Sequence, residues 1–181
     1  IMDIRSLAIH GGITGDPYTG AVTVPIYQTS TYAQESVGKH RGFEYSRTGN
    51  PTREALEKLI ADLEEGYRGF AFSSGMSAIS SVLMLLKSGD HILVSDDVYG
   101  GTFRVIDKVF KNFNLEYDFI DTSNIDKVRN GIKANTKMIY IETPTNPLMK
   151  LTHIRSIVEL AKEKEILTVV DNTFATPYLQ R

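Results

Sequence analysis

The sequence contains no cysteine. Disulfide bonds, zinc sites built from cysteine and a cysteine nucleophile are therefore excluded for these 181 residues. Proteins without disulfides are typical of the cytoplasm, where we expect this protein to act. The four histidines stand far apart and show no metal-ligand spacing, so we predict no metal site.

Long hydrophobic runs and a large excess of one charge are also missing. No window approaches the ~18 uninterrupted apolar residues of a membrane span, and no basic region followed by an apolar run marks a secretory signal. The formal net charge is −2, which gives no electrostatic reason to bind nucleic acid. With 41% hydrophobic and 23% charged residues, we expect a soluble globular protein with neither membrane nor nucleic acid as a partner.

Residues 1–49 show no sustained hydrophobic period and contain many glycines. Within them, residues 22–32 favour an extended arm, which has no core of its own and must lie on another surface, such as a neighbouring subunit. A regular pattern begins at Asn50 and Pro51, which favour the N-terminus of a helix. We therefore divide the chain into an arm, residues 1–49, and a domain, residues 50–181.

From residue 50 onward, two hydrophobic periods alternate. After a first helix that ends near Gly66, short apolar runs predict strands near residues 69–73, 91–95, 116–120, 137–142 and 166–170. Apolar residues at helical spacing predict helices near residues 76–87, 101–112, 124–132 and 154–161. Strands that alternate with helices pair in parallel, so we predict an α/β fold whose mainly parallel sheet is covered by helices on both faces.

Polar clusters follow four of the predicted strands, at residues 74–76, 96–99, 142–147 and 171–173. Sheets of this kind bind ligands at the carboxyl ends of their strands. The turn at residues 73–75 leads into a helix, so its free backbone N–H groups and the helix dipole favour a phosphate. The same serines and glycine would also cap a helix with no ligand present, which is the more common use of such a turn. The four clusters together indicate a ligand site more strongly than any one of them.

The side chains of these clusters suit a phosphorylated, flat, cationic heteroaromatic ring. Asp171 could keep a ring nitrogen protonated, Tyr99 could stack on the ring face, and Asn146 could hydrogen-bond a ring substituent. Pyridoxal 5'-phosphate (PLP) has all of these features. Each residue also has an ordinary structural explanation: Asp171 as a turn residue, Tyr99 as the opening of a helix, and residues 142–147 as a rigid loop.

Five segments, taken in order, resemble a known enzyme family. They are YSRTGNPT at residues 45–52, SSGMSA at 73–78, DVYGGT at 97–102, ETPTNP at 142–147 and VDNTF at 170–174. Their order and spacing resemble the Cys/Met-metabolism family of PLP-dependent enzymes, which act in transsulfuration. The resemblance implies the PLP-dependent transferase fold type I, PLP as the cofactor, and a homotetramer built as a dimer of dimers in which subunits share active sites.

The resemblance also implies roles for individual residues. The cofactor-binding residues would be Tyr45, Arg47, Gly75, Met76, Tyr99, Asn146, Asp171 and Thr173. Gly75 and Met76 would hold the phosphate through their backbone N–H groups. Tyr45 and Arg47 would reach the phosphate of the neighbouring subunit's cofactor. Tyr99 would be catalytic as well, because its hydroxyl would donate a proton to the leaving group, while Glu142 carries over more weakly.

One part of the family pattern is not in this sequence. In the family, the lysine that holds the cofactor lies in a Ser-x-Thr-Lys-type motif beyond the Asp-Asn-Thr element, and a C-terminal domain follows. This sequence ends at Arg181, before that motif. We therefore expect it to be roughly the first half of a longer enzyme, with residues 50–181 forming the N-terminal part of the large PLP-binding domain.

The reaction implied by the resemblance is that of a carbon–sulfur lyase. Gly101 stands where methionine γ-lyases typically carry a cysteine, so residues 99–102 resemble the cystathionine γ-lyase and γ-synthase branch instead. Residues 10–16 and 25–32 resemble bacterial cystathionine or homocysteine γ-lyases. The resemblance therefore favours γ-elimination on L-cystathionine or homocysteine, giving cysteine, 2-oxobutanoate and ammonia from cystathionine. The alternatives are γ-replacement, as in cystathionine γ-synthase and O-acetylhomoserine sulfhydrylase, and the reaction of cystathionine β-lyase. Outside the family, a non-catalytic binding module remains open, whereas a dinucleotide-binding domain is disfavoured because residues 73–78 lack its glycine spacing.

Overall fold

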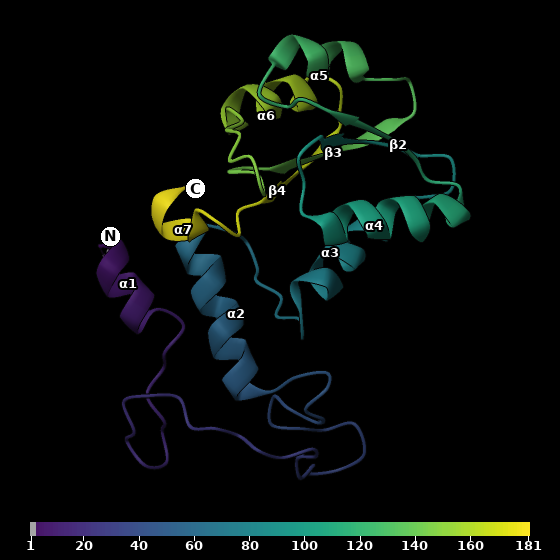
Figure 1. Ribbon diagram of the computed structural model, residues 1–181. Helices are drawn as coiled ribbons and strands as arrows, with labels where there is room; N and C mark the ends of the chain where they lie inside the picture. Colours follow the sequence, from purple (N-terminus) through teal and green to yellow (C-terminus); the bar gives the residue numbers. More distant parts are fainter. Residues whose placement is uncertain (1–2) are drawn as a thin grey trace. The chain divides into compact units, whose positions relative to one another are not determined.

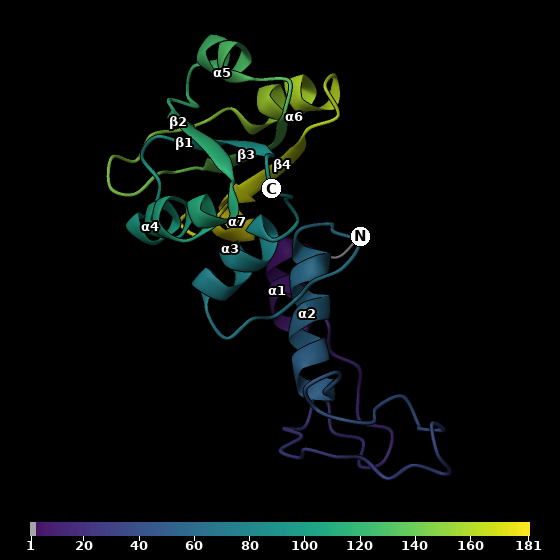
Figure 2. The ribbon, with the colours of Figure 1, turned by 90° about the vertical axis from the view of Figure 1, so that its right-hand side faces the viewer.

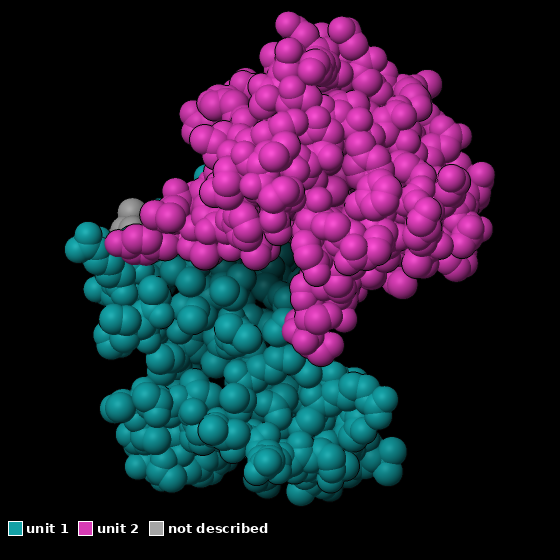
Figure 3. All heavy atoms as spheres, in the orientation of Figure 1, with its two compact units in different colours: residues 1–71, 181 teal, residues 72–180 magenta. Residues whose placement is uncertain are grey.

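The computed structural model describes residues 3–181. The chain divides into two compact units, one formed by the residues up to 71 together with Arg181 and the other by residues 72–180 (Figure 3). Within the described residues, no helix is long and apolar enough to cross a membrane.

Two packed helices organise the first unit, α1 (Ile4–His10) and α2 (Pro51–Leu63). The predicted helix start at residue 50 is confirmed, because the Asn50 side chain accepts hydrogen bonds from the N–H groups of Thr52 and Arg53 and Pro51 lies in the first turn. Helix α1 was not predicted. It has only seven residues and lies in the segment 1–49, which shows no sustained hydrophobic period.

The segment between α1 and α2 contains no named strand or helix, and most of its side chains are exposed. It is fastened to the start of α2 by side-chain hydrogen bonds. The Asn50 amide donates to the carbonyl oxygen of Tyr27 at 3.0 Å, and the Thr52 hydroxyl donates to the carbonyl oxygen of Pro25 at 2.9 Å. The contact of this segment with a neighbouring subunit stays a prediction.

The second unit is built on a four-stranded parallel sheet. Its strands are β1 (His91–Ser95), β2 (Glu116–Ile120), β3 (Thr136–Glu142) and β4 (Leu167–Asp171), in the order β2-β1-β3-β4. Its helices are α3 (Gly75–Leu83), α4 (Gly100–Lys108), the 3-10 helix η1 (Phe110–Phe113), α5 (Ile125–Gly131), α6 (Ile154–Lys162) and α7 (Thr176–Leu179). Helices α3 and α4 cover one face of the sheet, and α5 and α6 cover the other (Figures 1 and 2). The predicted α/β fold is confirmed.

Side chains alternate between the two faces along each strand, so the hydrophobic core is divided into two clusters, one on each face of the sheet. On β3, Met138 and Tyr140 pack toward Leu83 of α3 and Ile106 of α4. The alternate residues of the same strand, Ile139 and Ile141, pack toward Ile157 of α6. Glu142 therefore points to the same face as Tyr140, and so does Asp171, which is its register partner on β4. Two carboxylates thus lie at the carboxyl end of the sheet, on the face that α3 and α4 cover.

The strand predicted near residues 69–73 is wrong. A strand needs a neighbouring strand for its backbone N–H and C=O groups, and the sheet of residues 72–180 provides none. Residues 69–71 run along α2 instead. The Ala71 N–H donates to the Glu57 carboxylate at 3.1 Å, and a Cβ at Gly69 would collide with the Glu57 carbonyl oxygen. The turn at Ser74 therefore enters its helix from an extended segment outside the sheet.

Two predicted helices differ in extent, and one short helix was not predicted. The helix predicted at residues 76–87 ends at Leu83, and a turn follows in which the Lys87 N–H donates to the Asp90 carboxylate and Gly89 has φ +86°. The helix predicted at 101–112 is divided into α4 and η1. Helix α7 was missed, since four residues carry no period.

Candidate active site

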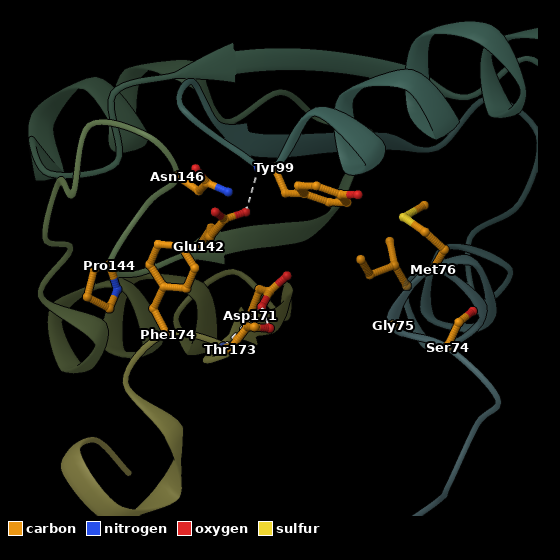
Figure 4. A pocket seen from close by; sticks show the side chains of 11 residues that line it. Ser74, Gly75, Met76, Tyr99, Glu142, Pro144, Asn146, Asp171, Thr173 and Phe174 are labelled. Carbon is orange, nitrogen blue, oxygen red and sulfur yellow. Dashed lines mark hydrogen bonds between the residues drawn. The ribbon is translucent and has the colours of Figure 1, made fainter.

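A cavity of about 450 Å³ opens at the carboxyl end of the sheet, entirely within the second unit. Its lining includes every predicted site residue from Gly75 onward, namely Gly75, Met76, Tyr99, Asn146, Asp171 and Thr173. It also includes Ser74, Ile79, Glu142, Pro144 and Phe174. Figure 4 shows Tyr99, Asp171 and the turn at Ser74 and Met76 around this one cavity. Gly75 and Asp171, about 100 positions apart in the sequence, are brought together because α3 packs on the face of the sheet to which Asp171 points.

The N-terminus of α3 forms one wall of the cavity. The Ser74 side chain caps the helix by accepting the N–H of Ser77 at 3.1 Å. The first N–H groups of a helix, here those of Gly75 and Met76, have no acceptor within it. A Cβ placed on Gly75 would meet no atom within 4 Å, so the space beside this backbone is open. The wall therefore offers an anion two backbone donors at the positive end of a helix.

Tyr99 lies at the N-terminus of α4 with 45% of its surface exposed. Its backbone N–H donates to the Glu142 carboxylate at 2.7 Å. A Cβ on Gly101 would collide with the Tyr99 ring and with the Met76 sulfur. The absence of a side chain at Gly101 therefore lets the ring lie close to α3, where one of its faces is available to the cavity.

Glu142 ends β3 and is buried, with 5% of its surface exposed. Burial raises the pKa of its carboxyl, the hydrogen bond from the Tyr99 N–H opposes this rise, and the negative charge of Asp171 adds to it. The Glu142 carboxylate thus connects the end of β3 to the N-terminus of α4, the helix that follows β1. The sequence resemblance carried this residue over only weakly, whereas the structure places it between Tyr99 and Asp171 on the cavity wall.

Both oxygens of the Asp171 carboxylate accept hydrogen bonds. Oδ1 accepts the backbone N–H of Thr173 at 3.2 Å and the Thr173 hydroxyl at 2.5 Å. Oδ2 accepts the phenolic hydroxyl of Tyr140 at 3.0 Å. Sequence reasoning missed Tyr140 because it lies in the continuous apolar run of β3. The available signal was its position two residues before Glu142, which places it on the same face of the strand.

The loop after β3 is held by Asp97. Its Oδ2 accepts the Thr145 hydroxyl at 2.5 Å and the Leu148 N–H at 2.8 Å. The peptide bonds before Pro144 and Pro147 are both cis. These contacts fix the path of the loop that carries Asn146 to the cavity.

Tyr45 and Arg47 belong to the first unit. The Arg47 guanidinium donates to the Tyr45 hydroxyl at 2.8 Å and lies 5.2 Å from the centre of its ring. Both side chains are exposed. Their role toward a cofactor stays a prediction.

Nearly the whole chain is similar in sequence to one family of enzymes. The family model described as Cys/Met metabolism PLP-dependent enzyme matches residues 5–181. Cystathionine gamma-lyase of Bacillus subtilis is 57% identical over 99% of this chain and 48% of its own length. Cystathionine beta-lyase of Lactococcus lactis subsp. cremoris is 58% identical over 98% of this chain and 47% of its own length.

Among solved structures, cystathionine gamma-lyase from Lactobacillus plantarum, complexed with L-serine, superimposes with a TM-score of 0.94 and 52% identity. The match covers 98% of this chain and 46% of that one. The chain thus spans about half the length of these relatives. It belongs to the Cys/Met-metabolism family of PLP-dependent enzymes, as the sequence resemblance predicted.

The cofactor of this family is PLP, and the residues of the cavity fit it. The open backbone at Gly75 and Met76 suits a phosphate, and the doubly hydrogen-bonded Asp171 carboxylate suits a protonated ring nitrogen. The exposed face of Tyr99 suits an aromatic ring.

Proposed function

We propose that the full-length protein is a PLP-dependent carbon–sulfur lyase that catalyses γ-elimination on L-cystathionine or homocysteine. From cystathionine the products would be cysteine, 2-oxobutanoate and ammonia. The observation that carries this proposal is the single cavity of about 450 Å³ lined by a backbone anion site, a fixed carboxylate and a tyrosine ring. No one of these groups is specific, but together they match the phosphate, the ring nitrogen and the ring face of PLP.

When bound, PLP withdraws electrons from the α-carbon of an amino acid, which allows loss of a proton and of a sulfur substituent. In this proposal the N–H groups of Gly75 and Met76 hold the phosphate. Asp171 keeps the ring nitrogen protonated, and Tyr99 stacks on the ring. The Tyr99 hydroxyl then donates a proton to the departing sulfur. Asn146 and Thr173 contact the cofactor or substrate from the loops after β3 and β4.

The choice of γ-elimination on cystathionine rests on two relatives named cystathionine gamma-lyase and on Gly101, which argues against a methionine γ-lyase. A relative named cystathionine beta-lyase is as similar, so β-elimination is the alternative that product analysis must distinguish. A cystathionine gamma-lyase is 57% identical to this chain, and another is 52% identical in the structural comparison. Gly101 is packed against the Tyr99 ring, and its position would take no side chain without moving that ring.

We also propose that the enzyme is a cytoplasmic homotetramer in which Tyr45 and Arg47 bind the phosphate of a neighbouring subunit's cofactor. Their exposure and mutual hydrogen bond support the proposal, because the pair presents a guanidinium and a phenol to solvent. Replacing Arg47 with Ala in the full-length enzyme should weaken PLP retention. Unchanged retention would place Arg47 outside the active site.

The experiment that tests the proposed function is product analysis with the full-length, PLP-loaded protein. With L-cystathionine, γ-elimination releases cysteine and 2-oxobutanoate, whereas β-elimination releases homocysteine and pyruvate. Cysteine and 2-oxobutanoate as main products would support the proposal. Homocysteine and pyruvate would reassign the enzyme to the β-lyases, and formation of cystathionine from cysteine and an activated homoserine would reassign it to the synthases. A protein that binds no PLP would overturn the proposed function altogether.

A further inference from the structure

A buried tyrosine stands directly behind the proposed cofactor-binding carboxylate. The Tyr140 ring is 2% exposed and packs in the core between the sheet and helices α3 and α4. At the edge of this core, its hydroxyl donates a hydrogen bond to Asp171 Oδ2 at 3.0 Å. Tyr140 opposes Val169 in the register of β3 and β4, so it lies diagonally across from Asp171 on the same face.

We infer that Tyr140 is a positioning residue that fixes the orientation of the Asp171 carboxylate toward the cofactor ring. The inference rests on the proposed function, in which Asp171 pairs with the ring nitrogen. Tyr140 is not among the residues that line the cavity, so its effect on the cofactor would pass through Asp171.

Hydrogen bonds to both carboxylate oxygens restrict rotation of the Asp171 side chain. The Thr173 donors hold Oδ1 from the loop side, and the Tyr140 hydroxyl holds Oδ2 from the core side. Each carboxylate oxygen offers about two lone pairs. Oδ1 accepts two bonds from Thr173, whereas Oδ2 accepts only the Tyr140 hydroxyl and so keeps a lone pair for a ligand. Without Tyr140, only neighbouring loop atoms would orient the carboxylate.

The Tyr140 hydroxyl is suited to be a permanent donor. Burial raises its pKa, and the negative charge of Asp171 raises it further. The phenol therefore stays protonated and directs its hydrogen to the carboxylate, which makes a charge-assisted hydrogen bond.

The second carboxylate of the cavity makes such a donor necessary. Glu142 lies two residues after Tyr140 on the same face, and its charge repels that of Asp171. The two carboxylates use separate donors: Glu142 accepts the Tyr99 N–H, and Asp171 accepts the Tyr140 hydroxyl. This division keeps each carboxylate with its own partner at neighbouring strand ends.

The test is a double-mutant cycle in the full-length enzyme, with the dissociation constant of PLP measured from the absorbance of the bound cofactor. Tyr140→Phe keeps the ring that fills the core and removes only the hydroxyl. It should weaken PLP binding about tenfold, the effect of losing one hydrogen bond to a charged group. In an Asp171→Ala background the same substitution should have no further effect, because no carboxylate remains to be held.

The matched control is Tyr117→Phe. Tyr117 also donates its hydroxyl to a carboxylate, Asp107 Oδ1 at 2.5 Å, but neither residue lines the cavity. This substitution should leave PLP affinity unchanged. The melting temperatures of the cofactor-free variants show whether both keep the fold.

Equal PLP affinity in Tyr140→Phe and wild type would overturn the inference. It would also be overturned if Tyr140→Phe weakened PLP binding as much in the Asp171→Ala background as in wild type, because Tyr140 would then have a merely structural role. A crystal structure of the wild-type, PLP-loaded enzyme provides a measurement that needs no variant. We expect the Tyr140 hydroxyl within about 3 Å of Asp171 Oδ2; a hydroxyl bonded elsewhere would contradict the inference. If wild type itself binds no PLP, the proposed function fails, and this outcome is distinct from the others.

Discussion

The two ends of the parallel sheet both carry buried polar side chains, but they use them differently. At the amino end, His91 is fully buried between Thr136, at 2.7 Å from its Nδ1, and Asp118, at 3.2 Å from its Nε2. Lys133 completes this network with an ion pair to Asp118 at 2.7 Å. At the carboxyl end, Glu142 accepts the Tyr99 N–H and Asp171 accepts the Tyr140 hydroxyl. These two carboxylates nevertheless border an open cavity of about 450 Å³.

The difference distinguishes a structural network from a binding site. At the amino end the polar groups satisfy one another, so the network stabilises the fold and offers little to a ligand. At the carboxyl end the hydrogen bonds fix the side chains, while Tyr99 and the N-terminus of α3 line the cavity. Buried polar residues alone therefore do not identify the site; the unfilled volume beside them does.

The largest effect is expected at the carboxyl end. Asp171→Ala in the full-length enzyme should weaken PLP binding about 100-fold, because the ring nitrogen loses a charged hydrogen-bond partner worth about 1.5–3 kcal/mol. The matched control is Asp118→Ala at the amino end, which should lower stability and leave PLP affinity unchanged. Equal PLP affinity in wild type and Asp171→Ala would remove the distinction between the two ends.

The next effect concerns stability at the amino end. His91→Ala leaves a cavity and removes a partner from both Thr136 and Asp118, so the free energy of unfolding should fall by about 2–3 kcal/mol. Urea denaturation of the PLP-free protein measures this loss. PLP affinity should remain within about twofold of wild type; a large loss of affinity would show that the two ends are coupled.

A smaller effect should appear with pH. Burial lowers the pKa of His91 below 6.5, Lys133 lowers it further, and Asp118 opposes both. Below pH 6.5 the unfolded chain therefore binds a proton that the folded protein does not, and stability falls as pH decreases. We expect a loss of about 1 kcal/mol per pH unit in this window. In His91→Gln the pH dependence between pH 7 and 5.5 should be weaker; an unchanged slope would assign it to other groups.

The smallest effect distinguishes two roles of Glu142. Glu142→Gln keeps an oxygen that can accept the Tyr99 N–H, whereas Glu142→Ala removes it. We expect Ala to weaken PLP binding about threefold to tenfold through a less fixed Tyr99, and Gln to have little effect. If Gln and Ala weaken binding equally, the charge of Glu142 matters rather than its hydrogen bond.

The sequence predicted the sheet better than its surroundings. The four strands of the sheet lie within one residue of their predicted positions. β1 and β3 are short, mostly buried apolar runs, and the half-buried β2 and β4 are short segments that lie between helices. The segment at 69–73 has a similar composition but no partner strand in the described residues, and composition does not report pairing. Helices α1 and α7 were missed because they are too short for a period.

The sequence predicted those site residues that directly follow apolar runs. Tyr99, Asn146 and Asp171 stand at strand ends, where polar residues after apolar runs are visible in the sequence. The sequence did not predict Tyr140 as a site residue, because its position in an apolar run is typical of a core residue. Only the register of β3 and β4 brings its hydroxyl to Asp171.

The most direct test of the account is a crystal structure of the full-length protein loaded with PLP. We predict that the cofactor occupies the cavity of residues 74–174, with its phosphate on the N–H groups of Gly75 and Met76, its ring on Tyr99 and its ring nitrogen at Asp171. PLP bound elsewhere, or a ring nitrogen without contact to Asp171, would contradict the assignment of this cavity as the active site.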